Sequence, residues 1–181
     1  MIDPNITTIF VILLRFLVPF TILRWPLAGT ILAILADTSD IMIFEAQGYG
    51  FLEGIPYHYL DKIFDIWALF FEFLVVRKWV DVLARRTGMI LFGWRFIGFI
   101  IFLIIGLREV FFFAPNIFEY FFITMLVIWK FDEKFELKKK SLAIILLAIG
   151  IPSIIKEYFM HFTHFSIWMW FRDNVFYWLY D

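Results

Sequence analysis

The 181-residue sequence contains no cysteine, and this absence excludes both a disulfide framework and a thiolate metal site. The chain also has little net charge, because 16 Lys and Arg residues stand against 17 Asp and Glu residues. The resulting formal charge of −1 gives no indication of nucleic-acid binding. The sequence also has no internal repeat, no P-loop, no dinucleotide-binding fingerprint and no nucleophilic triad. The sequence therefore carries none of the common signatures of a nucleotide-dependent or serine-type enzyme.

Apolar residues, in contrast, are abundant. They make up 63% of the chain, 26 of the residues are Phe, and the mean hydropathy is +0.86. A soluble domain of this size cannot bury so much apolar surface. We therefore expect an integral membrane protein of the plasma membrane or an organellar membrane, surrounded by membrane lipids. Residues 1–5 lack the basic region of a signal peptide, so we expect the first hydrophobic segment to be retained.

The hydrophobic runs predict the architecture. A transmembrane helix needs about 20 mostly apolar residues. By this measure the sequence predicts an all-α, polytopic membrane protein in which residues 1–181 form a single domain of six transmembrane helices. The six predicted spans are approximately residues 6–23, 26–46, 62–80, 88–107, 115–130 and 141–160. The aromatic segment 165–172 is short for a further span and is typical of an interfacial helix.

The distribution of Lys and Arg predicts the orientation in the membrane, since short cytoplasmic loops carry an excess of both residues. One side of the six-span arrangement collects ten of them: Arg24, Arg77, Lys78, Arg85, Arg86, Lys130, Lys134, Lys138, Lys139 and Lys140. The other side has four: Lys62, Arg108, Lys156 and Arg172. We therefore expect the first group in the cytoplasm, and the loop between the second and third spans outside.

Four aspartates in the second and third predicted spans form a candidate site. Asp37 and Asp40 are three residues apart and share a helix face, and Asp61 and Asp65 repeat this arrangement at a spacing of four. Carboxylates so close repel each other unless a positive charge lies between them. Two such couples joined by one loop can converge on a hard divalent cation, Mg²⁺ or Mn²⁺. A structural cluster of salt bridges accounts for the same pattern equally well.

Other charges in the predicted spans indicate ion pairs. Glu72 and Arg95 lie at nearly the same depth, and we expect them to form a buried pair that fixes the packing of two helices. Arg15, near the middle of the first span, lies at the depth of Asp37 and is its expected partner.

The histidines are weaker candidates. Glu157, His161 and His164 share one helix face, and His58 is close to Asp61 in the sequence. A zinc site of His and carboxylate ligands is conceivable. Interfacial histidines among aromatic residues are the favoured interpretation.

The N-terminal third of the chain resembles the CDP-alcohol phosphatidyltransferases, a family of six-helix membrane enzymes of phospholipid biosynthesis. Members of that family commonly begin with Pro-Asn, followed by Thr, Arg and Pro. Here residues 4–7 read Pro-Asn-Ile-Thr, and Arg15 and Pro19 follow. The family signature is D-x2-D-G-x2-A-R-x8-G-x3-D-x3-D, and its two aspartate pairs match Asp37 with Asp40 and Asp61 with Asp65.

The resemblance implies a function for these residues. It implies that the four aspartates coordinate a divalent metal and that Asp65 is the catalytic base that deprotonates the attacking alcohol. The chain would then be a diverged transferase of phospholipid headgroups. Two other classes remain open: a cation or proton transporter or channel that uses the same aspartates, and a non-catalytic subunit that binds partner helices in an oligomer or a larger membrane complex.

Overall fold

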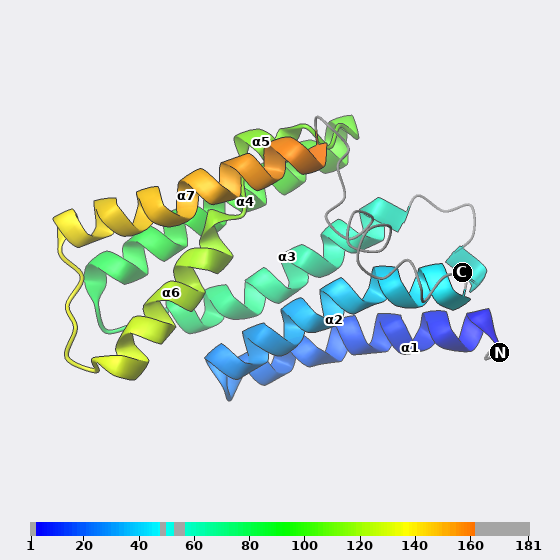
Figure 1. The fold of residues 1–181 in the computed structure, drawn as a ribbon, viewed down its shortest axis with the longest axis horizontal. Coiled ribbons are helices and arrows are strands. Elements are labelled where there is room, and N and C mark those ends of the chain that lie inside the picture. Colours follow the sequence, from blue (N-terminus) through cyan, green and yellow to red (C-terminus); the bar gives the residue numbers. More distant parts are fainter. Residues whose placement is uncertain (1–2, 48–49, 53–56, 162–181) are drawn as a thin grey trace, which may run out of the picture.

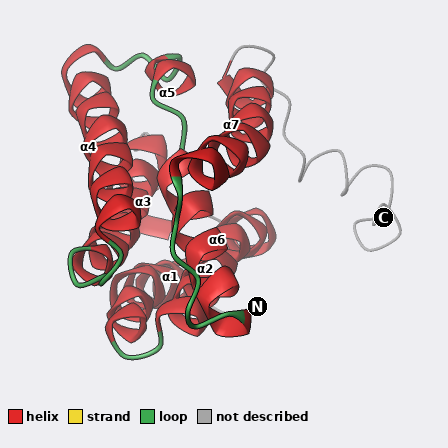
Figure 2. Ribbon diagram, turned by 90° about the vertical axis from the view of Figure 1, so that its left-hand side faces the viewer, coloured by secondary structure: helices red, strands yellow, loops and turns green. Residues whose placement is uncertain are grey.

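The computed structural model describes residues 3–47, 50–52 and 57–161, and all regular secondary structure in these ranges is helical (Figure 2). The prediction of an all-α fold is confirmed for these residues. The α-helices are α1 (Pro4–Leu17), α2 (Pro26–Gln47), α3 (Tyr57–Val76), α4 (Val82–Ile105), α5 (Val110–Phe113), α6 (Ile117–Phe131) and α7 (Lys139–His161). Two 3-10 helices, η1 (Val18–Leu23) and η2 (Gly50–Leu52), lie between them.

Four helical segments are long and apolar enough to cross a membrane, which agrees with the predicted integral membrane protein. They are Pro4–Leu23, Pro26–Phe44, Val82–Ile105 and Lys139–Phe159. The helices α3 and α6 coincide with the other two predicted spans. However, α3 carries several charges, and the 15 residues of α6 extend over about 22 Å. The count of six spans therefore stays a prediction, and the expected interfacial helix at 165–172 lies outside the described residues.

The first two long helices form a tight antiparallel hairpin (Figure 1). The α1 helix starts at Pro4, where the side chain of Asp3 accepts a hydrogen bond from the free backbone N–H of Asn5. It continues through η1, and α2 then returns along it. A Cβ atom on Gly29 would lie 2.5 Å from the backbone nitrogen of Ile22, so the hairpin closes this tightly because residue 29 has no side chain. The close packing brings residues 4–47 into one layer.

The remaining helices pack on this hairpin through a large apolar core. The α3 helix lies beside the hairpin and α6 crosses the molecule, while α7 packs against α5 and α6 (Figure 1). Aromatic rings fill much of the core: Trp79 stacks on Phe122 with ring centroids 5.7 Å apart, and Phe118 and Phe121 are fully buried. Such pairs stabilise the core beyond the area that they bury. The core therefore joins η1, α3, α4 and α6 into one packed unit.

The charge bias makes the orientation testable by cysteine labelling, and the native chain contributes no background because it has no cysteine. Arg108 follows α4 and Lys134 lies between α6 and α7, and both residues are exposed. A membrane-impermeant thiol reagent added to intact cells should label an Arg108→Cys variant and leave a Lys134→Cys variant unlabelled. Labelling of Lys134→Cys alone would reverse the predicted orientation.

Candidate functional site

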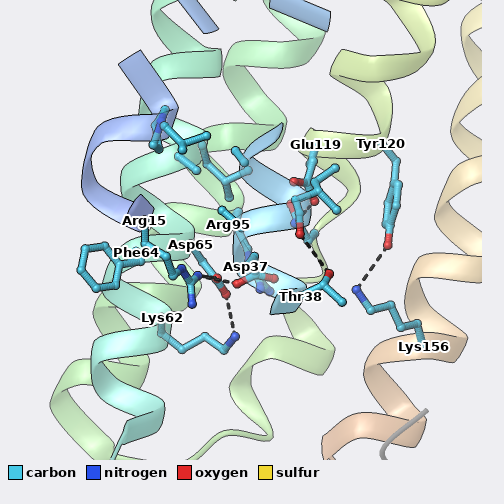
Figure 3. Close-up of a pocket in the computed structure, with 18 of the residues that line it drawn as sticks. Arg15, Asp37, Thr38, Lys62, Phe64, Asp65, Arg95, Glu119, Tyr120 and Lys156 are labelled. Atoms are coloured by element: carbon cyan, nitrogen blue, oxygen red, sulfur yellow. Dashed lines mark hydrogen bonds and ion pairs between the residues drawn. The ribbon is translucent and has the colours of Figure 1, made fainter. Parts of the chain in front are cut away.

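The guanidinium group of Arg15 lies among four aspartate carboxylates. Its Nη1 atom is 2.9 Å from Asp61 Oδ1, and its Nη2 atom is 2.9 Å from Asp65 Oδ1. The same two nitrogens pair with Asp40 and Asp37, respectively, and Figure 3 shows Arg15 beside Asp65 and Asp37. The Arg15 side chain is 4% exposed. Both aspartate couples thus contact the buried guanidinium group of Arg15, and the expected pair of Arg15 and Asp37 is present.

Helix geometry explains why one side chain can reach all four carboxylates. Asp37 and Asp40 are one turn apart on α2, and Asp61 and Asp65 are one turn apart on α3, so each couple presents both carboxylates on one face. Arg15 lies in the last turn of α1, next to both helices. A planar guanidinium has five N–H donors and can serve several carboxylates at once.

Two residues that the sequence analysis did not assign complete this acidic cluster. Lys62 Nζ is 2.7 Å from Asp61 Oδ2 and 2.6 Å from Asp65 Oδ2, and Tyr57 donates a hydrogen bond to Asp40. Four carboxylates against the cations of Arg15 and Lys62 leave two formal negative charges. A signal for Tyr57 was present in the sequence, because it precedes Asp61 by four residues and therefore shares its helix face.

The carboxylates of the acidic cluster are not all saturated by these contacts. The Oδ1 atom of Asp40 is buried and has no hydrogen-bond partner among the described residues. Asp37, Asp61 and Asp65 each offer one oxygen such that the three atoms lie within 4.8 Å of one another. Asp40 is not part of this group of three. The structure thus brings three of the four predicted ligands within reach of one metal ion.

A cavity of about 210 Å³ extends from the acidic cluster toward α6 and α7 (Figure 3). Asp37 and Asp65 line one end of it, and Glu119, Tyr120 and Lys156 line the other. The side chain of Asp37 is 46% exposed, whereas that of Asp40 is 1% exposed, so the cluster is open on the side of Asp37. A small ligand in the cavity would contact carboxylate oxygens of Asp37 and Asp65 as well as the ammonium group of Lys156.

The predicted ion pair between Glu72 and Arg95 is wrong. Arg95 Nη1 lies 2.7 Å from the backbone oxygen of Ala114 and 3.4 Å from Glu157 Oε1. Glu72 instead accepts a hydrogen bond of 3.0 Å from the hydroxyl of Thr30. The two residues lie at a similar depth but point to different neighbours, because Arg95 faces α5 and α7 while Glu72 faces α2. The depth of a residue in the helix bundle does not determine on which face of its helix the side chain lies.

The histidine candidates cannot be placed in the same way. The side chains of His58 and His161, and the whole of His164, lie outside the described part of the structure. Glu157, their expected carboxylate partner, is 4% exposed and contacts Arg95 and the backbone N–H of Asn116. Its described contacts therefore join α7 to the start of α6, and the zinc site stays a hypothesis.

Comparison of the chain with known protein families, curated proteins and solved structures found no match. The resemblance to the CDP-alcohol phosphatidyltransferases therefore receives no support from these comparisons. The fold and the site thus define the class of protein: a helical protein with membrane-compatible helices and a partly buried acidic cluster.

The acidic cluster predicts a strong dependence of stability on Arg15. Removing the guanidinium in an Arg15→Gln variant leaves buried carboxylates, Asp40 above all, without their cation, and should cost about 3 to 5 kcal/mol of folding free energy. Thermal unfolding of the purified protein in detergent measures the change. Arg24→Gln is the matched control, since Arg24 is exposed at the end of η1.

A second substitution separates charge from packing. Adding Asp40→Asn to Arg15→Gln removes the stranded carboxylate and should recover part of the lost melting temperature. An Arg15→Gln variant that melts with the Arg24→Gln control would contradict the role of Arg15 as the central counter-ion.

Proposed function

We propose that this chain binds a divalent cation at its acidic cluster and uses it for phosphoryl transfer on a lipid headgroup at the membrane. One observation carries the proposal: the oxygens of Asp37, Asp61 and Asp65 that lie within 4.8 Å of one another. A cation with ligand distances of about 2.0 to 2.6 Å joins oxygens that are about 3 to 5 Å apart. Oxygen ligands of this kind favour Mg²⁺ or Mn²⁺ over softer metals.

The charge balance of the acidic cluster supports the same conclusion. Arg15 and Lys62 offset two of the four carboxylate charges, and the buried Oδ1 of Asp40 has no described partner. A divalent cation would bring the formal charge of the cluster to zero. Since Arg15 contacts Asp37, Asp61 and Asp65, its guanidinium must shift when a cation takes these oxygens. The cavity beside Asp37 gives it space to move.

The roles of individual residues follow from the resemblance of residues 4–65 to the CDP-alcohol phosphatidyltransferases. By that resemblance all four aspartates would hold the cation and Asp65 would also be the base, whereas the three oxygens close enough to share an ion are those of Asp37, Asp61 and Asp65. A bound divalent cation supplies Lewis-acid stabilisation of the charge on the phosphate. Asp65 would accept the proton of the attacking alcohol, and the hydrogen bond from Lys62, 2.6 Å long, would orient its carboxylate for that transfer.

The sequence departs from the family pattern at the positions expected to accept the CDP group. Ile41 stands in place of Gly, Phe44 in place of Ala and Glu45 in place of Arg, and the gap from Asp40 to Asp61 is three residues longer. The charge bias also predicts that the acidic end of the protein faces outward, away from cytosolic nucleotides. We therefore base the proposal on the carboxylates and not on a CDP pocket.

Transport of cations or protons is the second candidate function. The observation that favours it is the row of ionisable side chains along the cavity, from Asp65 and Asp37 to Glu119 and Lys156. Ionisable residues at membrane depth commonly form such relays. Transport would need the same carboxylates but no attacking alcohol.

Metal binding gives the first test. A ligand that binds the folded state raises the melting temperature, so Mn²⁺ should stabilise the purified protein, and the electron paramagnetic resonance signal of free Mn²⁺ should fall on addition of protein. Asp61→Asn should abolish both effects. Asp132→Asn is the matched control, since Asp132 is exposed at the end of α6, and should retain them. Equal Mn²⁺ binding by all three proteins would overturn the proposal.

A second experiment separates the two functions. In proteoliposomes, the transferase should release CMP or another phosphorylated leaving group from a labelled lipid donor in the presence of Mn²⁺ and a small alcohol. A transporter should instead dissipate a proton or cation gradient without consuming the lipid. CDP-diacylglycerol is the first donor to test, because the family resemblance implies a CDP-linked lipid. The departures at Ile41, Phe44 and Glu45 argue against this donor, so the experiment decides between the two indications.

A further inference from the structure

A second buried acid lies apart from the acidic cluster. Glu72, on α3, is 1% exposed, and the fully buried hydroxyl of Thr30 donates a hydrogen bond of 3.0 Å to its Oε1 atom. Its Oε2 atom is buried and has no hydrogen-bond partner among the described residues. Glu72 follows Asp65 by two helical turns, so it lies about 10 Å further along α3. The proposed phosphoryl transfer does not use it.

The surroundings of Glu72 are apolar. Leu69 and Val76 are its neighbours on the same face of α3, and they are 2% and 0% exposed. Both belong to the main core, together with Ile22 from η1 and Phe118 from α6. An unpaired carboxylate in such surroundings costs far more free energy than a neutral carboxylic acid. Burial without a cation therefore favours the protonated form.

The charged groups around Glu72 do not supply that cation. Among the described residues, none of the ion pairs includes Glu72. Arg95 on α4 contacts Ala114 and Glu157, and Arg15 on α1 is held by the aspartates. The α2 helix contributes the neutral Thr30. The α6 helix, which packs against α3, contributes Glu119, a like charge that directly follows the core residue Phe118.

Glu119 connects this buried acid to the cavity. Its side chain lines the cavity and accepts a hydrogen bond of 2.8 Å from the side-chain amide of Asn116. Figure 3 shows Glu119 at the end of the cavity opposite Lys62. A carboxyl group in the core on α3 and a second one at the cavity wall on α6, the helix that packs against α3, form a minimal path for moving a proton between the core and the cavity.

We propose that Glu72 is a proton-binding site that exchanges its proton with the cavity through Glu119. The ligand is a proton, held as a carboxylic acid whose carbonyl oxygen accepts the hydrogen bond from Thr30. Glu119 relays the proton, because it lines the cavity and directly follows the core residue Phe118. The site is independent of the metal proposal, since it shares none of the four aspartates.

Infrared difference spectroscopy of the purified protein at neutral pH tests the site directly. The carbonyl stretch of a protonated carboxylic acid is separate from the bands of carboxylates, and it shifts in D₂O. Wild-type protein should show this band, and Glu72→Gln should lose it. Glu133→Gln is the matched control, because Glu133 is exposed in the loop after α6, and should keep it. A wild-type spectrum without the band, or a Glu72→Gln spectrum that retains it in full, would overturn the assignment.

Two further variants test the hydrogen bond and the path without removing Glu72. Thr30→Val is similar in volume and should shift the frequency of the band, because the hydroxyl that bonds to Glu72 is gone. Glu119→Gln should leave the band in place and slow its exchange into D₂O severalfold. An unchanged frequency in Thr30→Val, or an unchanged exchange rate in Glu119→Gln, would overturn the corresponding half of the proposal.

Discussion

The contact between one guanidinium group and four carboxylates determines how the first three helices can pack. Ionised side chains that leave water cost free energy unless they are paired, and the acidic cluster holds six of them. Arg15 reduces this cost by pairing with all four aspartates, and Lys62 joins Asp61 to Asp65 through their other carboxylate oxygens. A shift of α1 relative to α2 or α3 would separate these charges from their partners. The register of the three helices is therefore fixed by electrostatics as well as by apolar packing.

The rest of the bundle keeps polar and apolar regions apart. The cavity, with its charged walls, lies between the acidic cluster and the start of α6, whereas apolar side chains make up the aromatic core around Trp79 and Phe122. Arg95 and Glu157 form a second link, which joins α4 to α7 at the cavity. Glu72 is the exception to this separation, and an exception of this kind is a candidate for function rather than for packing.

The sequence was informative about the helices because apolar length is a local property. The predicted segment 26–46 matches α2, which runs from Pro26 to Gln47, almost residue by residue. The segment 62–80 misses the start of α3 at Tyr57, because the charges near that end reduce its hydropathy. The α5 helix was not predicted, since four residues are too few to give a periodic signal.

For the site, spacing was sufficient to group the aspartates, because residues three or four apart on a helix share a face. It was not sufficient to choose between partners on different helices. Glu72 and Arg95 have matching depths, yet the rotation of α4 about its axis directs Arg95 toward Ala114 and Glu157. That rotation depends on contacts across the whole bundle, and no pattern within either helix encodes it. The role of Lys62 was missed for a different reason: its pairing with Asp65 is a local contact at a spacing of three on α3, and the sequence analysis did not use that spacing.

The order of the charged residues along the chain has a consequence for biogenesis. A nascent chain enters the membrane from its N-terminus, and Arg15 is the first of these charges to arrive. The α1–α2 hairpin then brings Asp37 and Asp40 to it, and α3 arrives with Asp61 and Asp65 already bridged by their own Lys62. Each added helix thus finds or carries its counter-ion at the time of insertion. The acidic cluster can assemble from the first 65 residues of the chain, before α4, α6 and α7 are synthesised.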